Sequence, residues 1–199
     1  MALKNQTDPK WAARQLAEAI KRHVAPASAV EVTNVTIPHS TGMSGETVLF
    51  DATWDGATRA LAARVQPPGP SVFPRYDLQL EFNVMRTVGE HSDVPVPRML
   101  FSEEGSDLLG SPFIVMERVA GRVPSDDPPY TTAGWVLELT PEQQATMYDN
   151  ALTQIAAIHA VDIDAAGLGK LREHPEAGFE GQLRFWENTF AWAANGESN

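Results

Sequence analysis

Apolar positions along the chain follow two spacings, which divide it into predicted helices and strands. Near the start, Leu16 and Ile20 lie four positions apart within 9–24, which predicts a helix. The following stretch is rich in β-branched residues and short alternating runs, which favour strands. We expect these strands at 30–38, 46–54, 57–65, 98–102 and 112–119. One helix is expected among them, over 76–91.

Short connections join the strands of this stretch. Asp55-Gly56 separates the second strand from the third, and this dipeptide is a strong signal for a two-residue hairpin turn. Consecutive strands with short connections favour antiparallel pairing. The pattern therefore predicts an α+β fold whose mainly antiparallel sheet carries one helix.

Helical spacing returns in the last third of the chain, after a loop over 120–134 that contains prolines and glycines. Thr140, Pro141 and Gln143 form the pattern of an N-cap, a first-turn proline and a capping box, so a helix should begin there. The apolar residues of this helix recur at helical spacing, at Tyr148, Leu152, Ile155 and Ile158. A last helix is expected over 178–194.

Composition narrows the classes of function. The 199 residues include 15 Lys and Arg against 26 Asp and Glu, a formal net charge of −11. Such an acidic chain repels phosphate backbones, which argues against nucleic-acid polymers as partners. The chain has no cysteine, which excludes disulfides, thiol catalysis and Cys-based zinc sites. No apolar run approaches the roughly 20 residues of a membrane span and no signal peptide is visible, so we expect a cytoplasmic protein without a membrane partner.

The first candidate for ligand chemistry is a loop of small residues between two predicted strands. Its members are Gly42, Met43, Ser44, Gly45 and Thr47. Small residues let the backbone approach a ligand closely, and N–H groups at such a turn can bind phosphate oxygens. A plain turn between strands is the alternative interpretation.

Two charged residues form the second candidate. Strand alternation places Ala62 and Arg64 on one face, where a small side chain leaves room for a flat ring and a guanidinium can bind anionic oxygens. Glu81 falls between Leu78 and Met85, in the apolar stripe of the predicted helix, where a carboxylate is costly unless it is paired. Arg64 is an available partner for it. The alternatives are a surface arginine and a solvated glutamate at the edge of the stripe.

The third candidate is the end of the last predicted strand, Met116-Glu117-Arg118-Val119, which leads into Ala120-Gly121. A strand that leaves its sheet exposes backbone N–H and C=O groups, which can pair with the edge of a base. Simple chain reversal is the alternative.

The order of these features resembles that in the aminoglycoside phosphotransferase-like enzymes, a family with the protein-kinase-like fold. The matching stretches are STGMSGET, LAARVQPP, LQLEFNVMRTVGE, SDVPVPRM, GSPFIVMERVAGRVP and LTQIAAIHAVD. The resemblance runs from about residue 30 to about 195. Residues 1–29, which precede it, contain the first predicted helix as a separate N-terminal segment. The resemblance implies a nucleotide-binding N-lobe over 30–119 with one inward-facing helix, and the first helices of a C-lobe over 120–199.

The resemblance also implies roles for the candidate residues. Gly42 to Thr47 would cover the nucleotide, and Arg64 would stand where such folds usually carry a phosphate-holding lysine, with Glu81 as its ion-pair partner. Met116 would line the back of the adenine pocket, and the backbones of Glu117 and Val119 would pair with adenine. ATP and magnesium are the implied cofactors.

The catalytic loop of the family, His-Gly-Asp followed by Asn and later a metal-binding Asp, does not occur in these 199 residues. Three stretches imitate parts of it: His91-Ser92-Asp93, the segment 159–164, and Trp54-Asp55-Gly56. We interpret them as a helix-to-strand turn, a helix end and the hairpin turn. The chain is therefore expected to stop before the catalytic loop, to contain no catalytic residue or metal ligand, and to be inactive alone.

Two functions from different classes follow. The first is an ATP-dependent phosphotransferase acting on a hydroxyl of an unknown small molecule, with its catalytic half outside this chain; residues 124–135, with Tyr130, are a speculative border of its substrate cleft. The second is a non-catalytic nucleotide-binding or partner-binding module, a pseudoenzyme or a short gene product. In that case the aromatic tail could drive homodimerisation, through Phe185, Trp186, Phe190 and Trp192.

Overall fold

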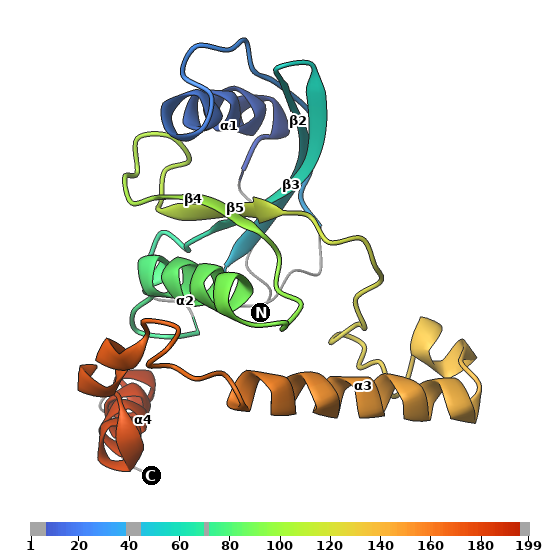
Figure 1. Ribbon diagram of the computed structural model, residues 1–199, viewed down its shortest axis with the longest axis vertical. Helices are drawn as coiled ribbons and strands as arrows, with labels where there is room; N and C mark the ends of the chain where they lie inside the picture. The colour runs from blue at the N-terminus through green and yellow to red at the C-terminus, as the bar shows by residue number, and fades with distance from the viewer. Residues whose placement is uncertain (1–6, 39–44, 70–71, 196–199) are drawn as a thin grey trace.

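The computed structural model describes residues 7–38, 45–69 and 72–195, and its first part is built around one sheet (Figure 1). The strands are β1 (Glu31–Thr36), β2 (Glu46–Trp54), β3 (Ala57–Val65), β4 (Met99–Glu103) and β5 (Phe113–Glu117). The helices are α1 (Pro9–His23), α2 (Leu78–His91), α3 (Pro141–His159) and α4 (Gly178–Ala194), with short 3₁₀ helices at Trp135–Glu138 and Gly169–Glu173. Each predicted helix and strand is confirmed, with ends that differ by at most two residues.

The sheet is antiparallel throughout, with the strand order β1-β2-β3-β5-β4. Its longest pairing is the β2–β3 hairpin, which closes at Asp55 and Gly56. Both residues have positive φ, 52° and 72°, as a type I′ turn requires. The predicted α+β class and the predicted hairpin are therefore confirmed.

The main core lies on the sheet face that α1 covers. Alternating residues of β2 and β3, among them Phe50, Leu61 and Ala63, are fully buried there. Leu16 and Ile20, the pair whose spacing predicted α1, pack into the same cluster. The helix starts where Asp8 caps it, because the carboxylate of Asp8 accepts a hydrogen bond from the backbone N–H of Trp11 at 2.7 Å.

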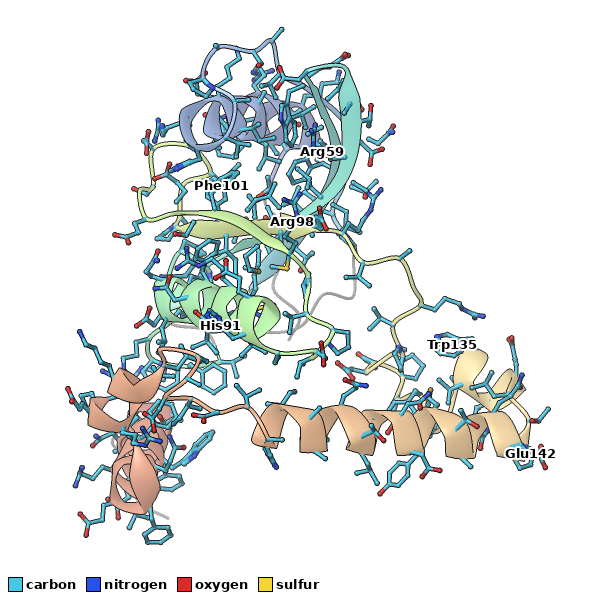
Figure 2. The ribbon with its side chains drawn as sticks, in the orientation of Figure 1. Arg59, His91, Arg98, Phe101, Trp135 and Glu142 are labelled. Atoms are coloured by element: carbon cyan, nitrogen blue, oxygen red, sulfur yellow. The ribbon has the colours of Figure 1, made fainter. Side chains whose placement is uncertain are left out.

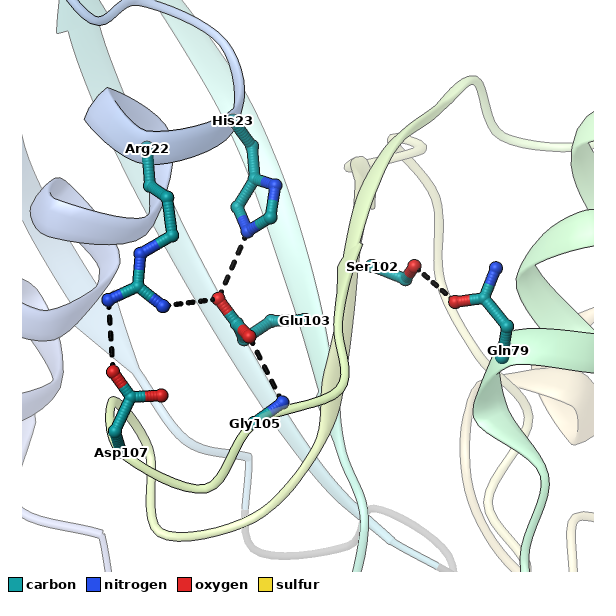
Figure 3. A network of polar contacts seen from close by, with 7 residues as sticks. All are labelled: Arg22, His23, Gln79, Ser102, Glu103, Gly105 and Asp107. Carbon is teal, nitrogen blue, oxygen red and sulfur yellow. Dashed lines mark hydrogen bonds and ion pairs between the residues drawn. The ribbon is translucent and has the colours of Figure 1, made fainter.

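A polar network fixes the end of α1 to the sheet (Figure 3). Glu103, the last residue of β4, is buried, and its Oε2 accepts a hydrogen bond from Arg22 at 2.9 Å. His23 Nε2 lies 3.0 Å from the same oxygen, and the backbone N–H of Gly105 donates to Oε1 at 3.0 Å. The ring of His23 also stacks on Phe101 at 4.7 Å between centroids. The carboxylate thus joins a helix to a strand about 80 positions away in the sequence.

A smaller core lies on the opposite sheet face, under α2. Leu78 and Phe82 of the helix pack with Met99 and Ile114 of the sheet. Ser102 points to the same side and donates a hydrogen bond to Gln79 at 2.5 Å (Figure 3). The helix begins at its N-cap Asp77, whose carboxylate accepts from the backbone N–H of Leu80 at 2.8 Å. The sheet is therefore a layer between α1 and α2 (Figure 1).

The last third of the chain leaves the sheet and forms helices below it (Figure 1). The predicted capping box of α3 is present, with Thr140 and Gln143 bonded to each other's backbone. None of the residues of α3 is buried, and its apolar stripe is exposed from Tyr148 to Ile158. The spacing of the stripe predicted the helix correctly, but within the described residues nothing covers its apolar face. In the described ranges, no helix combines the length and the apolar character that crossing a bilayer would demand.

Candidate functional site

Four of the predicted site residues share the sheet face that α2 partly covers. Ala62 pairs with Met116 of β5, and Arg64 pairs with Thr47 of β2. Directly paired residues of antiparallel strands project from the same face, and residues two apart do so as well. The sheet register therefore places a small side chain, a cation and a hydroxyl side by side on one surface.

The predicted partners Arg64 and Glu81 lie together at the edge of this surface. Arg64 Nη1 lies 3.0 Å from Glu81 Oε1, and their side chains are 38% and 29% exposed. A partly exposed pair of this kind stabilises a fold by only about 0–1 kcal/mol. The contact matters more for geometry, because it holds the guanidinium above the face that Ala62 and Thr47 share.

The small-residue loop approaches this pair at its C-terminal end. A Cβ on Gly45 would lie 3.0 Å from the carbonyl oxygen of Val65 and 3.8 Å from Nε of Arg64. The missing side chain of Gly45 therefore lets the backbone pass close to the arginine. Gly42, Met43 and Ser44 lie outside the described residues, so their predicted contact with a nucleotide stays a prediction.

The end of β5 forms the other border of the site. Met116 is partly buried and packs against the cluster under α2, while Val119, beyond the end of the strand, is 71% exposed. The backbone N–H of Glu117 donates to the carbonyl of Arg98 at 2.9 Å. A bound base could therefore use the carbonyl of Glu117 and the backbone of Val119, but not the N–H of Glu117.

Two arginines that sequence reasoning missed hold this strand end in place. Arg118 Nη2 donates to Asp51 of β2 at 2.8 Å, and the backbone N–H of Arg118 donates to Ala60 at 3.0 Å. Arg98, labelled in Figure 2, lies 2.7 Å from the carboxylate of Glu117. Asp51 and Arg118 are 67 positions apart, and no local pattern of the sequence connects them.

A pocket of about 520 Å³ opens beside the Arg64–Glu81 pair. Its first wall comes from the start of α2 and the segment before it, with Phe73 and Tyr76. Its second wall comes from the C-terminal part of the chain, with Phe185 and Trp186 of α4. We call this space the α4 pocket. An ion pair between Arg75 and Glu176, 101 positions apart, bridges the two walls.

The stretches that imitate catalytic motifs have structural roles. The ring of His91 (Figure 2) contacts the carbonyl of Thr87 at 3.0 Å, in the last turn of α2. Asp162 closes the turn after α3, since its carboxylate accepts from the backbone of Asp164 and Ala165. Asp55 is in the hairpin turn and accepts a hydrogen bond from Ser28 at 2.5 Å. Within 7–38, 45–69 and 72–195, no group of three or more His, Asp and Glu side chains could hold a metal ion.

Comparisons with known proteins agree with this geometry. The model of the phosphotransferase enzyme family matches residues 36–197. A crystal structure of a protein from Ralstonia eutropha JMP134, assigned as an aminoglycoside phosphotransferase, matches with a TM-score of 0.55 and 25% identity, over 93% of this chain and 48% of that one. The likeness confirms the expected protein-kinase-like fold.

Curated relatives are much longer than the matched region. The probable acyl-CoA dehydrogenase IBR3 of Arabidopsis thaliana is 29% identical over 129 residues, which cover 65% of this chain and 15% of that protein. Acyl-CoA dehydrogenase family member 11 of Rattus norvegicus is 27% identical over 113 residues, which cover 57% of this chain and 14% of that protein. The chain therefore spans about half of the solved relative and about a seventh of these curated ones.

Proposed function

Because the chain belongs to the phosphotransferase enzyme family, we propose that it is the nucleotide-binding part of an ATP-dependent phosphotransferase. The γ-phosphoryl group would pass to a hydroxyl of a small molecule. The observation that supports this most is the Arg64–Glu81 contact on the sheet face beside Gly45, since a positioned cation is what a nucleotide's phosphates need. The names of the relatives contain two classes of compound, acyl-CoA and aminoglycoside, and we take both as acceptor candidates; an acyl acceptor would need a hydroxyl on its chain to receive the phosphoryl group.

In this proposal each residue of the site has a separate task. Arg64 binds phosphate oxygens through its planar fork, and Glu81 keeps that fork oriented. Ala62 leaves room for the flat adenine ring, with Met116 behind it. The carbonyl of Glu117 and the backbone of Val119 pair with the edge of the base.

Magnesium and the catalytic groups belong to a different part of the proposed enzyme. The described residues do not fit a metal site, because they hold no suitable group of His, Asp and Glu side chains. The 199 residues also contain no His-Gly-Asp tripeptide. We therefore assign this chain nucleotide binding without catalysis and place the catalytic half outside it. We also propose that the chain acts in the cytoplasm.

A pair of matched arginine variants tests nucleotide binding. Arg64→Ala should weaken binding of Mg-ATP about tenfold or more, because a charge-assisted contact worth roughly 1.5–3 kcal/mol is lost. Arg59→Ala is the control: Arg59, labelled in Figure 2, is on the same strand, but its guanidinium stacks on Trp54, 3.8 Å from the ring centroid. Calorimetric titration with Mg-ATP measures both. Equal affinity for the two variants, or no binding to the unchanged chain at saturating nucleotide, contradicts the proposal.

A second candidate function is that of a non-catalytic binding module. It is favoured by the exposed apolar side chains of α4, which include Phe179, Trp186 and Phe190. Exposed faces of this kind mark interaction surfaces in soluble proteins. In this function the chain binds a nucleotide or a protein partner without transferring a phosphoryl group, and a second copy of the chain is one such partner.

A further inference from the structure

The α4 pocket has aromatic side chains on both of its walls. Phe185 and Trp186 form an edge-to-face pair on the α4 side, with ring centroids 5.1 Å apart. Phe73 and Tyr76 form another on the α2 side, with centroids 6.1 Å apart. Edge-to-face pairs are stable arrangements that present large apolar surfaces. The pocket is thus bordered by two aromatic pairs that are more than 100 positions apart in the sequence.

The segment that carries Phe73 is held by local hydrogen bonds. The hydroxyl oxygen of Tyr76 accepts from the backbone N–H of Val72 at 3.2 Å and from that of Phe73 at 3.4 Å. On the opposite wall, Trp186 is 54% exposed, although a tryptophan side chain gains strongly from burial. A large accessible indole beside a pocket offers a surface that an apolar ligand can cover.

Each carboxylate that lines the α4 pocket already has a partner. Glu81 contacts Arg64 at 3.0 Å, and Glu176 contacts Arg75. Asp77 caps α2 and accepts from the N–H of Leu80 at 2.8 Å. A polycationic ligand needs carboxylates that can receive its ammonium groups, and here it would compete for each of them with an arginine or with a helix cap, in a pocket that is also lined by Arg64 and Arg75. The charges of the pocket are therefore poorly suited to a polycation.

We propose that the α4 pocket binds the acceptor of the phosphotransferase, and that the part of the acceptor held there is uncharged and apolar apart from its hydroxyl. This inference rests on the proposed function, because the Arg64–Glu81 pair lines one side of the pocket and would hold the nucleotide's phosphates there. The volume of about 520 Å³ lies in the range of small-molecule sites. Of the two acceptor candidates, the acyl chain fits and the aminoglycoside does not.

The acceptor wall comes from an unexpected part of the sequence. Residues 124–135, which the sequence offered only as a speculative border of a substrate cleft, do not line the α4 pocket. The wall is formed instead by α4 and the segment before it, including His174. The aromatic tail then has a ligand-binding task in addition to any role in association.

Two tryptophans of α4 provide a matched test. The probe is 2-(2-naphthyl)ethanol, an uncharged aromatic alcohol, titrated calorimetrically into the 199-residue chain. Trp186→Ala should weaken binding of this probe about tenfold, because an aromatic wall is removed. Trp192→Ala, a change of the same size on the same helix but outside the pocket, should leave the affinity within about twofold. Trp186→Phe, which retains an aromatic surface, should recover most of the loss.

Neomycin and Mg-ATP complete the experiment. Neomycin, a polycationic aminoglycoside, should show no binding that depends on Trp186. The inference is overturned if neomycin binds and Trp186→Ala abolishes that binding, or if the two alanine variants bind naphthylethanol equally. Mg-ATP is titrated into the same proteins and should bind the Trp186 variants normally. If the unchanged chain does not bind Mg-ATP, the proposed function is contradicted. If binding of naphthylethanol still depends on Trp186 in that case, the result supports ligand binding in the α4 pocket.

Discussion

Glu103 illustrates how a single carboxylate can position an element of this protein. It is 8% exposed, and burial by itself disfavours its charged form. The hydrogen bonds from His23 and Gly105, together with the charge of Arg22, outweigh burial and hold the pKa of Glu103 below its ordinary value. The folded protein therefore binds a proton at this site less readily than the unfolded chain does.

The lowered pKa of Glu103 predicts a loss of stability in acid. A depressed pKa contributes stability that is fully present above the unfolded value, about 4.3, and is lost as the pH falls through the folded value. Glu103→Gln should lower the free energy of unfolding at pH 7 by about 1–3 kcal/mol and flatten the decline below pH 4.3. Glu104→Gln, at the neighbouring exposed glutamate, should match the unchanged chain. Thermal unfolding of both variants between pH 3 and 7 measures this dependence of stability on pH. If the stability of the two variants declines in parallel as the pH falls, the prediction is contradicted.

Among the elements, the β2–β3 hairpin has the clearest local cause. Asp55-Gly56 supplies two residues with positive φ, and nine residue pairs follow in unbroken register from Ala57 to Val65. This register decides which side chains face α1 and which face the candidate site. A shift of one residue would turn Arg64 and Ala62 to the buried face, so the turn also determines the site.

The turn makes a prediction about glycine. Gly56 has φ of 72° and no neighbour that a Cβ would strike, so Gly56→Ala should cost about 1–2 kcal/mol through backbone strain alone. Gly69→Ala is the control, since Gly69 is equally unobstructed but lies outside the positive-φ region. Urea denaturation provides the two free energies of unfolding. If both variants lower the free energy of unfolding equally, backbone strain at Gly56 is not the cause of the effect.

At the scale of the whole molecule, the three well-packed layers of α1, the sheet and α2 adjoin a part with little burial. The sheet, α1 and α2 enclose both hydrophobic clusters, whereas α3 contains no buried residue and α4 buries only Gly181 and Thr189. An isolated helix is only marginally stable in water, so such helices gain from a partner. The net charge of −11 opposes association of two copies.

These two effects predict salt-dependent self-association. We expect the 199-residue chain to form dimers through the apolar face of α4. Dimers should be more stable at 0.5 M than at 0.05 M salt, because the Debye length falls from about 13 to about 4 Å and the repulsion between the acidic copies is screened. Phe190→Glu should shift the equilibrium to monomers. Val123→Glu, which adds the same charge at an exposed position outside α4, should shift it much less. Sedimentation equilibrium measures this, and a chain that stays monomeric at both salt concentrations would refute the homodimer.

The sequence by itself determined the helices and strands, the hairpin and the likeness to a phosphotransferase family, and it identified Arg64 and Glu81 as partners. These features have local causes: β-branched runs, an Asp-Gly turn, caps such as Asp8 and Thr140, and periodic apolar residues. Only the tertiary structure decided the Glu103 network, the Arg118–Asp51 contact and the α4 pocket. Each of them joins residues 67 to 101 positions apart, and the side chains involved carry no pattern in their own neighbourhoods. Their contacts exist because the sheet register aligns distant strands and because α4 lies beside the start of α2. The short-range periodicity of the sequence does not determine either arrangement.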